Sequence, residues 1–516
     1  MGACIKLFLD PFNVAVGGFT LTFPSGTTER IFLNRPICIQ DLGAHQSLYH
    51  FTGSGGHKFC LKCLNTYARK SNLVDEDGDD LIRCDCITLA ELDRAEDADV
   101  LTAVDRLAEK KLVDPPELFQ RRQTALGYTY HPFHFLYDAM IRACCQPISG
   151  FMHDWMHCML VQGVVNTTLF LIMEDFRAVG QTYAVFEEYL GKFKWPLLFS
   201  GKPDVLCKKR VDAFRKAKKA NERRQVKMQA SEGLQILPVM ALFVMLVIKP
   251  SGRAAGACAV FLAMHGLLEL LIAIPHGYVT EAMLLGAVED FLKVFRDVYG
   301  TQWMHNKFHS LLHLPEELFR CGVLLTCWVH ERKHKVVKEF AEFIRNTRAY
   351  ERGVVSEAVC KQLAAMRQPS AFRRGSGLVR PSPCPRRVHA YLVELMGCPD
   401  VAGYDVFHGA VMKHSQCTAS KRKDVVLMSG RVVDRPHGEF VAGEVLHHLE
   451  VHGRPQQVPL SIVSVWEVLE LNAAKGYAVW KLSFSPRLVD AELILEALVY
   501  RAGEDEVLTL IPARFR

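Results

Sequence analysis

The pattern of hydrophobic and polar positions divides the chain into three parts. The first 45 residues contain the short apolar runs IKLFL, GGFTLTF and RIFLNRPICIQ, separated by turn residues, and the third run ends at Asp41. From about Leu89 to Tyr350, apolar residues recur mostly with helical spacing, interrupted by single prolines. After a Gly-, Ser- and Pro-rich stretch at 372–387, short apolar runs such as DVVLMSGRVV and GEFVAGEVLHHLEV predict strands.

Two long apolar stretches in the helical part raise the question of a membrane. Residues 237–248 are too few to span a bilayer, whereas 254–274 are enough but include His265 and Glu269. Because the following segment, 280–299, has an amphipathic pattern, we expect both stretches to be buried helices of an all-α core. A membrane hairpin remains the alternative, and no membrane partner is predicted.

Composition and charge fit a folded protein of several domains. The 516 residues are 49% hydrophobic and 23% charged, and the net charge of +6 permits a polyanionic partner without requiring one. The first residues lack the basic leader of a signal peptide. Seventeen cysteines without such a signal favour a reducing compartment, with thiols free or bound to metal.

Two pentads share the form His, acid, any, any, His: HDWMH at 153–157 and HERKH at 330–334. On a helix, each pentad would place two imidazoles on one face with the acid nearby, as in a metal or proton-transfer site. The chain has 21 histidines, so a single close pair also arises by chance. The repetition is what favours a functional interpretation.

A glycine-rich loop, GSGGHKFCLKC, leads into a CxxC pair formed by Cys60 and Cys63, with Cys84 and Cys86 downstream. A CxxC pair fits tetrahedral zinc but supplies only two of four ligands.

A second charged feature lies between residues 208 and 227, where ten Lys or Arg stand against two acids. A solvated helix is one interpretation, and contact with DNA phosphates is the one that we favour. The residues assigned to DNA binding are Lys208, Lys209, Arg210, Arg215, Lys216, Lys218, Lys219, Arg223 and Arg224.

Three blocks in order, between about residues 30 and 350, resemble CACTA (En/Spm-type) DNA transposases and related cut-and-paste elements. These blocks are QDLGAHQSLYHFTGSGGHKFCLKC, FMHDWMHCMLVQGV and KFHSLLHLPEELFRCGVLLTCWVHERKHKVVK. The resemblance implies a ribonuclease-H-like core of mixed sheet and helices, interrupted by a large helical insertion before its last acidic helix. It also implies DNA, at transposon ends, as the partner, a homo-oligomer on DNA, and a nuclear location.

The resemblance further implies paired Mg²⁺ or Mn²⁺ ions held by carboxylates, for which the candidates are Asp41, Asp154 and Glu331. A further acid is expected upstream of Asp41, and Asp10 is the available candidate. Alternatively, the chain lacks the first strand and its carboxylate.

Asp154 is ambiguous, because an Asp-x-x-His element also fits a structural zinc site. His157 would then join Cys60 and Cys63, with a fourth ligand from His153, Cys158 or Asp154 itself.

Two rival functions remain open. HERKH has the HExxH form of zinc metalloproteases, in which His330 and His334 would hold zinc and Glu331 would act as base. However, charged residues occupy its middle positions, and no HxxGxxH extension follows. A catalytically inactive, transposase-derived DNA-binding protein is the stronger rival.

In the nuclease interpretation, His330 and His334 would not hold zinc. They would orient Glu331 or approach the scissile phosphate.

These interpretations predict an α+β protein of five segments: the first part of a ribonuclease-H-like core with the CxxC pair at 1–88, a mainly helical insertion at 89–300, the closing acidic region at 301–371, a linker at 372–387, and a small β-barrel or sandwich at 388–516.

Overall fold

The computed structural model forms two compact units that interleave along the sequence. Unit 1 comprises Met1–Asp175, Arg223–Ala230 and Ala255–Glu331, and unit 2 comprises Phe176–Glu222, Ser231–Ala254 and Arg332–Arg516. The residues that the structure describes are 19–22, 26–31, 38–40, 42–68, 73–74, 84–144, 146–197, 203–209, 211, 225–327, 337–344, 350–366, 376–414, 419–433, 439–452 and 457–512.

The first described elements of unit 1 are short strands, as the short apolar runs predict. Strands β1 (Phe19–Thr22) and β2 (Thr28–Ile31) form an antiparallel hairpin. Strands β3 (Cys38–Gln40) and β4 (Phe151–His153) pair in parallel, although more than a hundred residues separate them. In this pair, Cys38 lies opposite Phe151 and Gln40 opposite His153, so both strands end at the same level.

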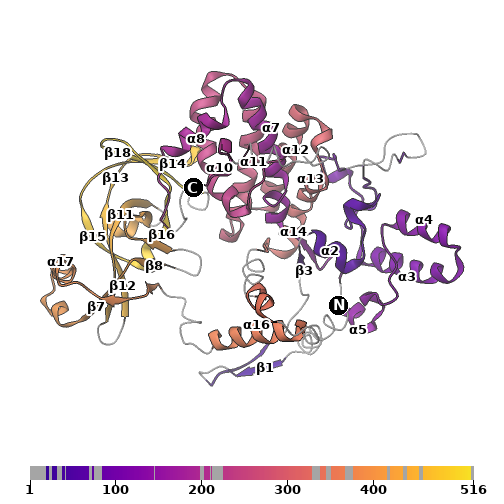
Figure 1. Cartoon of the computed structure of the whole chain (residues 1–516), viewed down its shortest axis with the longest axis horizontal. Helices are drawn as coiled ribbons and strands as arrows, with labels where there is room; N and C mark the ends of the chain where they lie inside the picture. Colours follow the sequence, from indigo (N-terminus) through magenta and orange to yellow (C-terminus); the bar gives the residue numbers. More distant parts are fainter. Residues whose placement is uncertain are drawn as a thin grey trace. The chain divides into compact units, whose positions relative to one another are not determined.

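Helices make up most of the described residues of unit 1 (Figure 1). They are α2 (Leu42–Tyr49), α3 (Asp97–Val113), α4 (Pro116–Leu126), α5 (Ala139–Cys144), α6 (Trp155–Met159), most of α7 (Val164–Ala178), α11 (Ala255–Ala273), α12 (Glu281–Tyr299), α13 (Asn306–Leu311) and α14 (Leu314–Cys321). These helices confirm the prediction of a mostly helical region from the spacing of its apolar residues.

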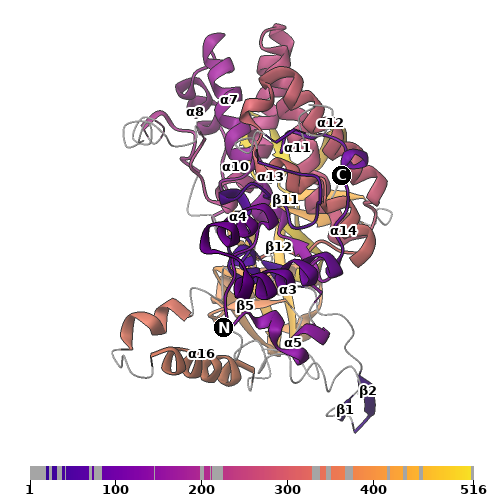
Figure 2. The ribbon, with the colours of Figure 1, turned by 90° about the vertical axis from the view of Figure 1, so that its right-hand side faces the viewer.

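Helix α12 shows how the sequence specifies these helices and fixes its neighbours. Thr280 caps it by accepting a hydrogen bond from the backbone N–H of Met283, and its buried residues recur every three or four positions. It packs beside α11 (Figure 2). On α12, Phe295 packs against Phe308 of α13 in a tilted arrangement with ring centroids 4.6 Å apart, which helps to anchor the short helix α13.

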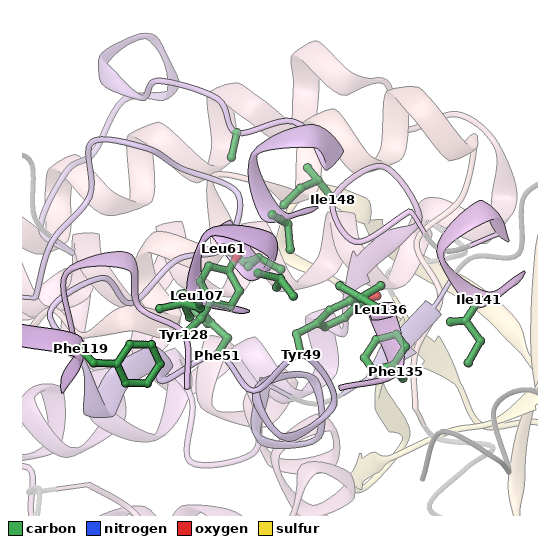
Figure 3. Close-up of a cluster of buried hydrophobic side chains, with 13 residues drawn as sticks. Tyr49, Phe51, Leu61, Leu107, Phe119, Tyr128, Phe135, Leu136, Ile141 and Ile148 are labelled. Carbon is green, nitrogen blue, oxygen red and sulfur yellow. The ribbon is translucent and has the colours of Figure 1, made fainter. Parts of the chain in front are cut away.

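A separate apolar cluster supports the segment that leads to the CxxC pair. Tyr49 at the end of α2 packs with Phe51, Phe135 and Leu136, and Leu61 belongs to the same cluster (Figure 3). The chain between α2 and the cysteines is therefore held by a core of its own.

Unit 2 contains the β-rich C-terminal region that the sequence predicts, and this region consists of antiparallel sheets. Its largest sheet follows the order β15-β12-β11-β10-β16, with β7 also pairing β11 and β6 pairing β7; a four-stranded sheet follows β13-β14-β18-β17, and a three-stranded one β5-β8-β9. The strands are β5 (Gly377–Val379), β6 (Ser382–Pro383), β7 (Asp405–Gly409), β8 (Val411–Lys413), β9 (Ala419–Lys421), β10 (Val425–Ser429), β11 (Phe440–His452), β12 (Gln457–Val465), β13 (Glu467–Asn472), β14 (Tyr477–Lys481), β15 (Pro486–Asp490), β16 (Ile494–Ala497), β17 (Tyr500–Ala502) and β18 (Glu506–Leu510).

Unit 2 also contains helices, four of which have eight or more residues among those described: α8 (Tyr183–Gly191), α10 (Ala230–Phe243), α16 (Tyr350–Met366) and α17 (Arg386–Met396).

Two features of the structure differ from the segments that the sequence predicts. Residues 89–300, expected as one insertion, contribute to both units. The expected linker includes β5 and β6, which are short but paired with β8 and β7.

Three helical stretches among the described residues have the length and composition to cross a membrane: Trp155–Ala178, Ala230–Ser251 and Ala255–His276. In each, more than half of the most apolar window is buried inside the protein, at 78%, 56% and 61%. This burial agrees with the expectation of core helices.

Candidate metal centre

The CxxC pair lies in a short segment that neighbouring backbone holds on both sides. Cys60 and Cys63 are buried, and Cys63 forms an isolated antiparallel bridge with Arg94. The backbone N–H of Leu64 donates to the carbonyl of Asp93, and the N–H of Ala95 donates to the carbonyl of Lys62. These contacts hold the backbone on both sides of Cys63.

Two histidines from the other end of unit 1 meet the thiols. His309 lies on α13, and His313 is the residue just before α14. The Nε2 of His313 is 3.2 Å from the Sγ of Cys60 and 3.6 Å from that of Cys63, and the Nε2 of His309 is 3.5 Å from the Sγ of Cys63. The two Nε2 atoms are 3.1 Å apart.

The four donor atoms fit one tetrahedral zinc ion. Zinc bound by two thiolates and two imidazoles has metal–ligand distances that place neighbouring donors roughly 3.3 to 3.8 Å apart, close to the separations observed. All four donors lie within 4.8 Å of one another, and all four residues are buried. Sulfur and nitrogen donors favour zinc over magnesium or calcium. Cys60, Cys63, His309 and His313 therefore form a buried cluster of two cysteines and two histidines that could bind a metal such as zinc.

The surroundings adjust the protonation of these groups. Burial raises the pKa of the Cys60 thiol, but hydrogen bonds from Cys63 and Lys62 and the charges of Lys62 and Arg94 together hold that pKa below its ordinary value. The hydrogen bond to Cys60 and burial raise the pKa of Cys63. Burial and the charge of His309 lower the pKa of His313, which favours the neutral imidazole that a metal requires.

Arg94 connects the centre to the protein surface. Its guanidinium lies 3.0 Å from the Nδ1 of His313, 3.9 Å from the Sγ of Cys63 and 2.9 Å from a carboxylate oxygen of Glu316. Metal binding through Nε2 puts the proton of His313 on Nδ1, which then no longer accepts a hydrogen bond. With metal bound, Arg94 would therefore turn toward Cys63 and Glu316.

A buried ionic network lies directly behind the centre. Lys62 is 2.5 Å from Glu317 and donates to the backbone carbonyl of Phe151, and Glu317 accepts from both the backbone and the side chain of His153. Burial raises the pKa of Glu317, but Lys62 and His153 outweigh it and hold that pKa at about 2. The network ties the CxxC segment, β4 and α14 together.

A second group of donor atoms lies at the end of β4. Asp154, His157 and Cys327 each place a donor within 4.8 Å of the other two. Asp154 and His157 also line a cavity of about 290 Å³, together with Cys158 and Lys307.

The structure brings together only some of the predicted site residues. Cys60 and Cys63 share a site, as expected. His157 is not part of it: among the described residues, the donors that complete the site are His309 and His313, while His157 pairs with Asp154. His153, Cys158 and Asp154, the expected sources of a fourth ligand, are also not in that group.

The first pentad does not lie on one helix face as expected. His153 ends strand β4, Asp154 caps α6 by accepting from the N–H of Met156, and the helix begins only at Trp155. The two imidazoles therefore point to different partners, His153 to Glu317 and His157 to Asp154.

Several predicted residues lie outside the described part of the chain. They are Asp10, Asp41, His330, Glu331, His334, Arg210, Arg215, Lys216, Lys218, Lys219, Arg223 and Arg224. Of the basic run, Lys208 and Lys209 are described, and the backbone N–H of Lys208 donates to Glu187.

His309 and His313 were the ligands that the sequence analysis missed. Their signal is present in KFHSLLHL, where two histidines four apart follow a CxxC pair, a spacing typical of zinc sites. Because about 250 residues separate these histidines from the cysteines, the sequence alone did not connect the two pairs.

Searches against models of known protein families and against curated proteins found no match for this chain. The resemblance to CACTA transposases therefore rests on the three sequence blocks alone.

Proposed function

We propose that the chain is a DDE-type transposase-like protein that cleaves and transfers DNA strands with Mg²⁺ or Mn²⁺ in a ribonuclease-H-like core. The observation that carries this proposal is the parallel pairing of β3 and β4, which end at Gln40 and His153 in register. Asp41 and Asp154 are the next residues in the sequence after each strand. The carboxyl ends of adjacent parallel strands are a common place for active sites.

The position of Cys327 supports the same convergence. Its thiol lies with Asp154 and His157, at the carboxyl end of β4. Glu331 follows four residues later in the sequence, and four residues of chain reach at most about 14 Å. Cys327, the last described residue before Glu331, thus lies at the carboxyl end of β4, next to Asp154.

Carboxylates at this place would suit phosphoryl transfer. Oxygen ligands favour Mg²⁺ and Mn²⁺, and two such ions about 4 Å apart polarise the attacking hydroxyl and stabilise the charge on the phosphate. Asp41 and Glu331 would hold the ions, with Asp10 or Asp154 as a further acid. The role proposed for the zinc centre is structural, since its four protein ligands leave no open position.

The partner of this activity would be DNA at transposon ends. The basic run 208–227 would contact phosphates, and strand transfer at two ends would require a homo-oligomer on DNA in the nucleus. The proposal assigns no role to a membrane.

The test is nicking of supercoiled plasmid DNA by the purified chain with Mn²⁺. We expect Glu331→Gln and Asp41→Asn each to lower the nicking rate by at least about 100-fold while DNA binding persists, because each change removes a metal ligand and no phosphate-binding cation. Glu342→Gln, which changes an exposed carboxylate on the segment that follows, is the matched control and should keep the parent rate.

The alternatives give different results in the same assay. A parent that binds DNA and never nicks it supports the inactive, transposase-derived protein. Metal-dependent peptide hydrolysis that Glu331→Gln abolishes, with zinc retained, supports the metalloprotease. Nicking that survives in Glu331→Gln would refute the role of this carboxylate.

A further inference from the structure

The end of β4 carries a second set of metal-type donors whose orientation is already fixed. Asp154 is only 2% exposed, and one of its carboxylate oxygens accepts from the backbone N–H of Met156 at 3.0 Å. The other oxygen contacts the Nδ1 of His157. The carboxylate is thus held by the first turn of α6 and faces an imidazole.

Cys327 joins this pair from a distant part of the sequence. The thiol is buried at 7% exposure, and it lies close enough to both residues for all three donors to fall within 4.8 Å of one another. One oxygen, one nitrogen and one sulfur donor form a set that zinc accepts and that magnesium does not favour.

The surroundings leave room for a further ligand. Asp154 and His157 line a cavity of about 290 Å³, and Lys307 supports its wall by donating to the backbone carbonyls of His157 and Val161. A cavity of this size holds several water molecules. Three protein ligands with a water at the fourth position is the arrangement of an open zinc site.

We propose that Asp154, His157 and Cys327 bind a zinc ion of their own, distinct from the ion of Cys60, Cys63, His309 and His313. The fourth position of this second zinc faces the cavity and takes a water molecule. In this proposal Asp154 is a zinc ligand. The carboxylates that bind Mg²⁺ or Mn²⁺ are then Asp41 and Glu331, with Asp10 as the further acid. The second zinc would hold the segment before HERKH against the end of β4.

The experiment is zinc analysis of the full-length protein by mass spectrometry after purification without chelators. The parent should hold two zinc ions per chain, one for each donor group. Cys327→Ser should hold one. Cys158→Ser is the matched control, because Cys158 is a buried cysteine that lines the same cavity and is not in the donor group, and it should retain two.

Cobalt substitution gives an independent readout. In the Cys60→Ser, Cys63→Ser double variant, the remaining cobalt should keep one thiolate charge-transfer band, and adding Cys327→Ser should remove it. If a variant does not fold, as judged by circular dichroism, the parent alone decides: two zinc ions support the proposal, and one zinc ion overturns it. Equal zinc content in the parent and Cys327→Ser would also overturn it.

Zinc content is measured without DNA, so this result stands apart from the nicking assay. Two zinc ions in a protein that does not nick DNA would support the second zinc site and contradict the proposed function. One zinc ion in a protein that nicks DNA would support the proposed function and contradict the second zinc site.

Discussion

At the scale of single residues, Lys62 and Glu317 form a buried ion pair beside the candidate metal centre. Both side chains are almost fully buried, with relative exposures of 6% and 1%. Removing one partner of a buried ion pair destabilises a fold, because the remaining charge is left desolvated and uncompensated. The pair also joins the CxxC segment to α14, the helix that follows His313.

We therefore expect Lys62→Met to lower the free energy of unfolding by about 3 to 5 kcal/mol, measured by urea denaturation at pH 7 with zinc present. Lys192→Met, which breaks an exposed pair with Glu188, is the control and should cost less than about 1 kcal/mol. Adding Glu317→Gln to Lys62→Met should recover part of the loss. A cost for Lys62→Met as small as that of the control would contradict the role of the pair.

At the scale of elements, buried histidines join four parts of the C-terminal sheets. His448 on β11 contacts the hydroxyls of Ser420 on β9 and Ser461 on β12, and His414, just after β8, contacts Ser420 as well. Burial lowers the pKa of His448 to about 3 and that of His414 to about 4. Both imidazoles are therefore neutral in the folded protein at neutral pH.

This arrangement predicts a loss of stability in mild acid. Both folded pKa values lie below the ordinary value of 6.5, so the stabilisation is fully present above pH 6.5 and is lost as the pH falls toward 4 and then 3. Below pH 6.5 the unfolded chain binds up to one more proton per histidine, which costs about 1.4 kcal/mol per pH unit for each.

His448→Gln replaces one of these histidines with a neutral amide. The urea midpoint of this variant should fall less between pH 7.5 and pH 5 than that of the parent. If the urea midpoints of the variant and the parent fell by the same amount between pH 7.5 and pH 5, the result would contradict a neutral, buried His448.

At the scale of the whole molecule, the sequence predicted the local helices and strands well. It predicted poorly which residues far apart in the sequence come into contact. The C-terminal strands follow the apolar runs closely, because strand patterning is local: β11, for example, spans Phe440–His452, and the run GEFVAGEVLHHLEV covers 438–451. The CxxC pair was also visible, because its spacing is local. His309 and His313 were not assigned, since tertiary packing of α13, which includes the contact of Phe308 with Phe295 of α12, brings them to the thiols.

The two pentads illustrate the same limit. HDWMH has helical spacing, but the strand pairing of β3 with β4 extends to His153, so Asp154 becomes a cap and the two histidines separate. Non-local pairing thus overrode a local pattern. The interleaving of the two units along the sequence has the same origin, because contacts between distant segments determine it and no local composition marks it.

The central claim is that Asp41 and Glu331 share one metal site, and Mn²⁺ binding followed by electron paramagnetic resonance tests it without a DNA substrate. The zinc-loaded parent should bind Mn²⁺, and Asp41→Asn and Glu331→Gln should each weaken that binding by at least about tenfold, or about 1.4 kcal/mol. Because both residues serve the same site, the double variant should bind hardly more weakly than either single variant. Glu342→Gln should bind as the parent does. Unchanged Mn²⁺ affinity in either single variant, or fully additive losses in the double variant, would contradict the shared site.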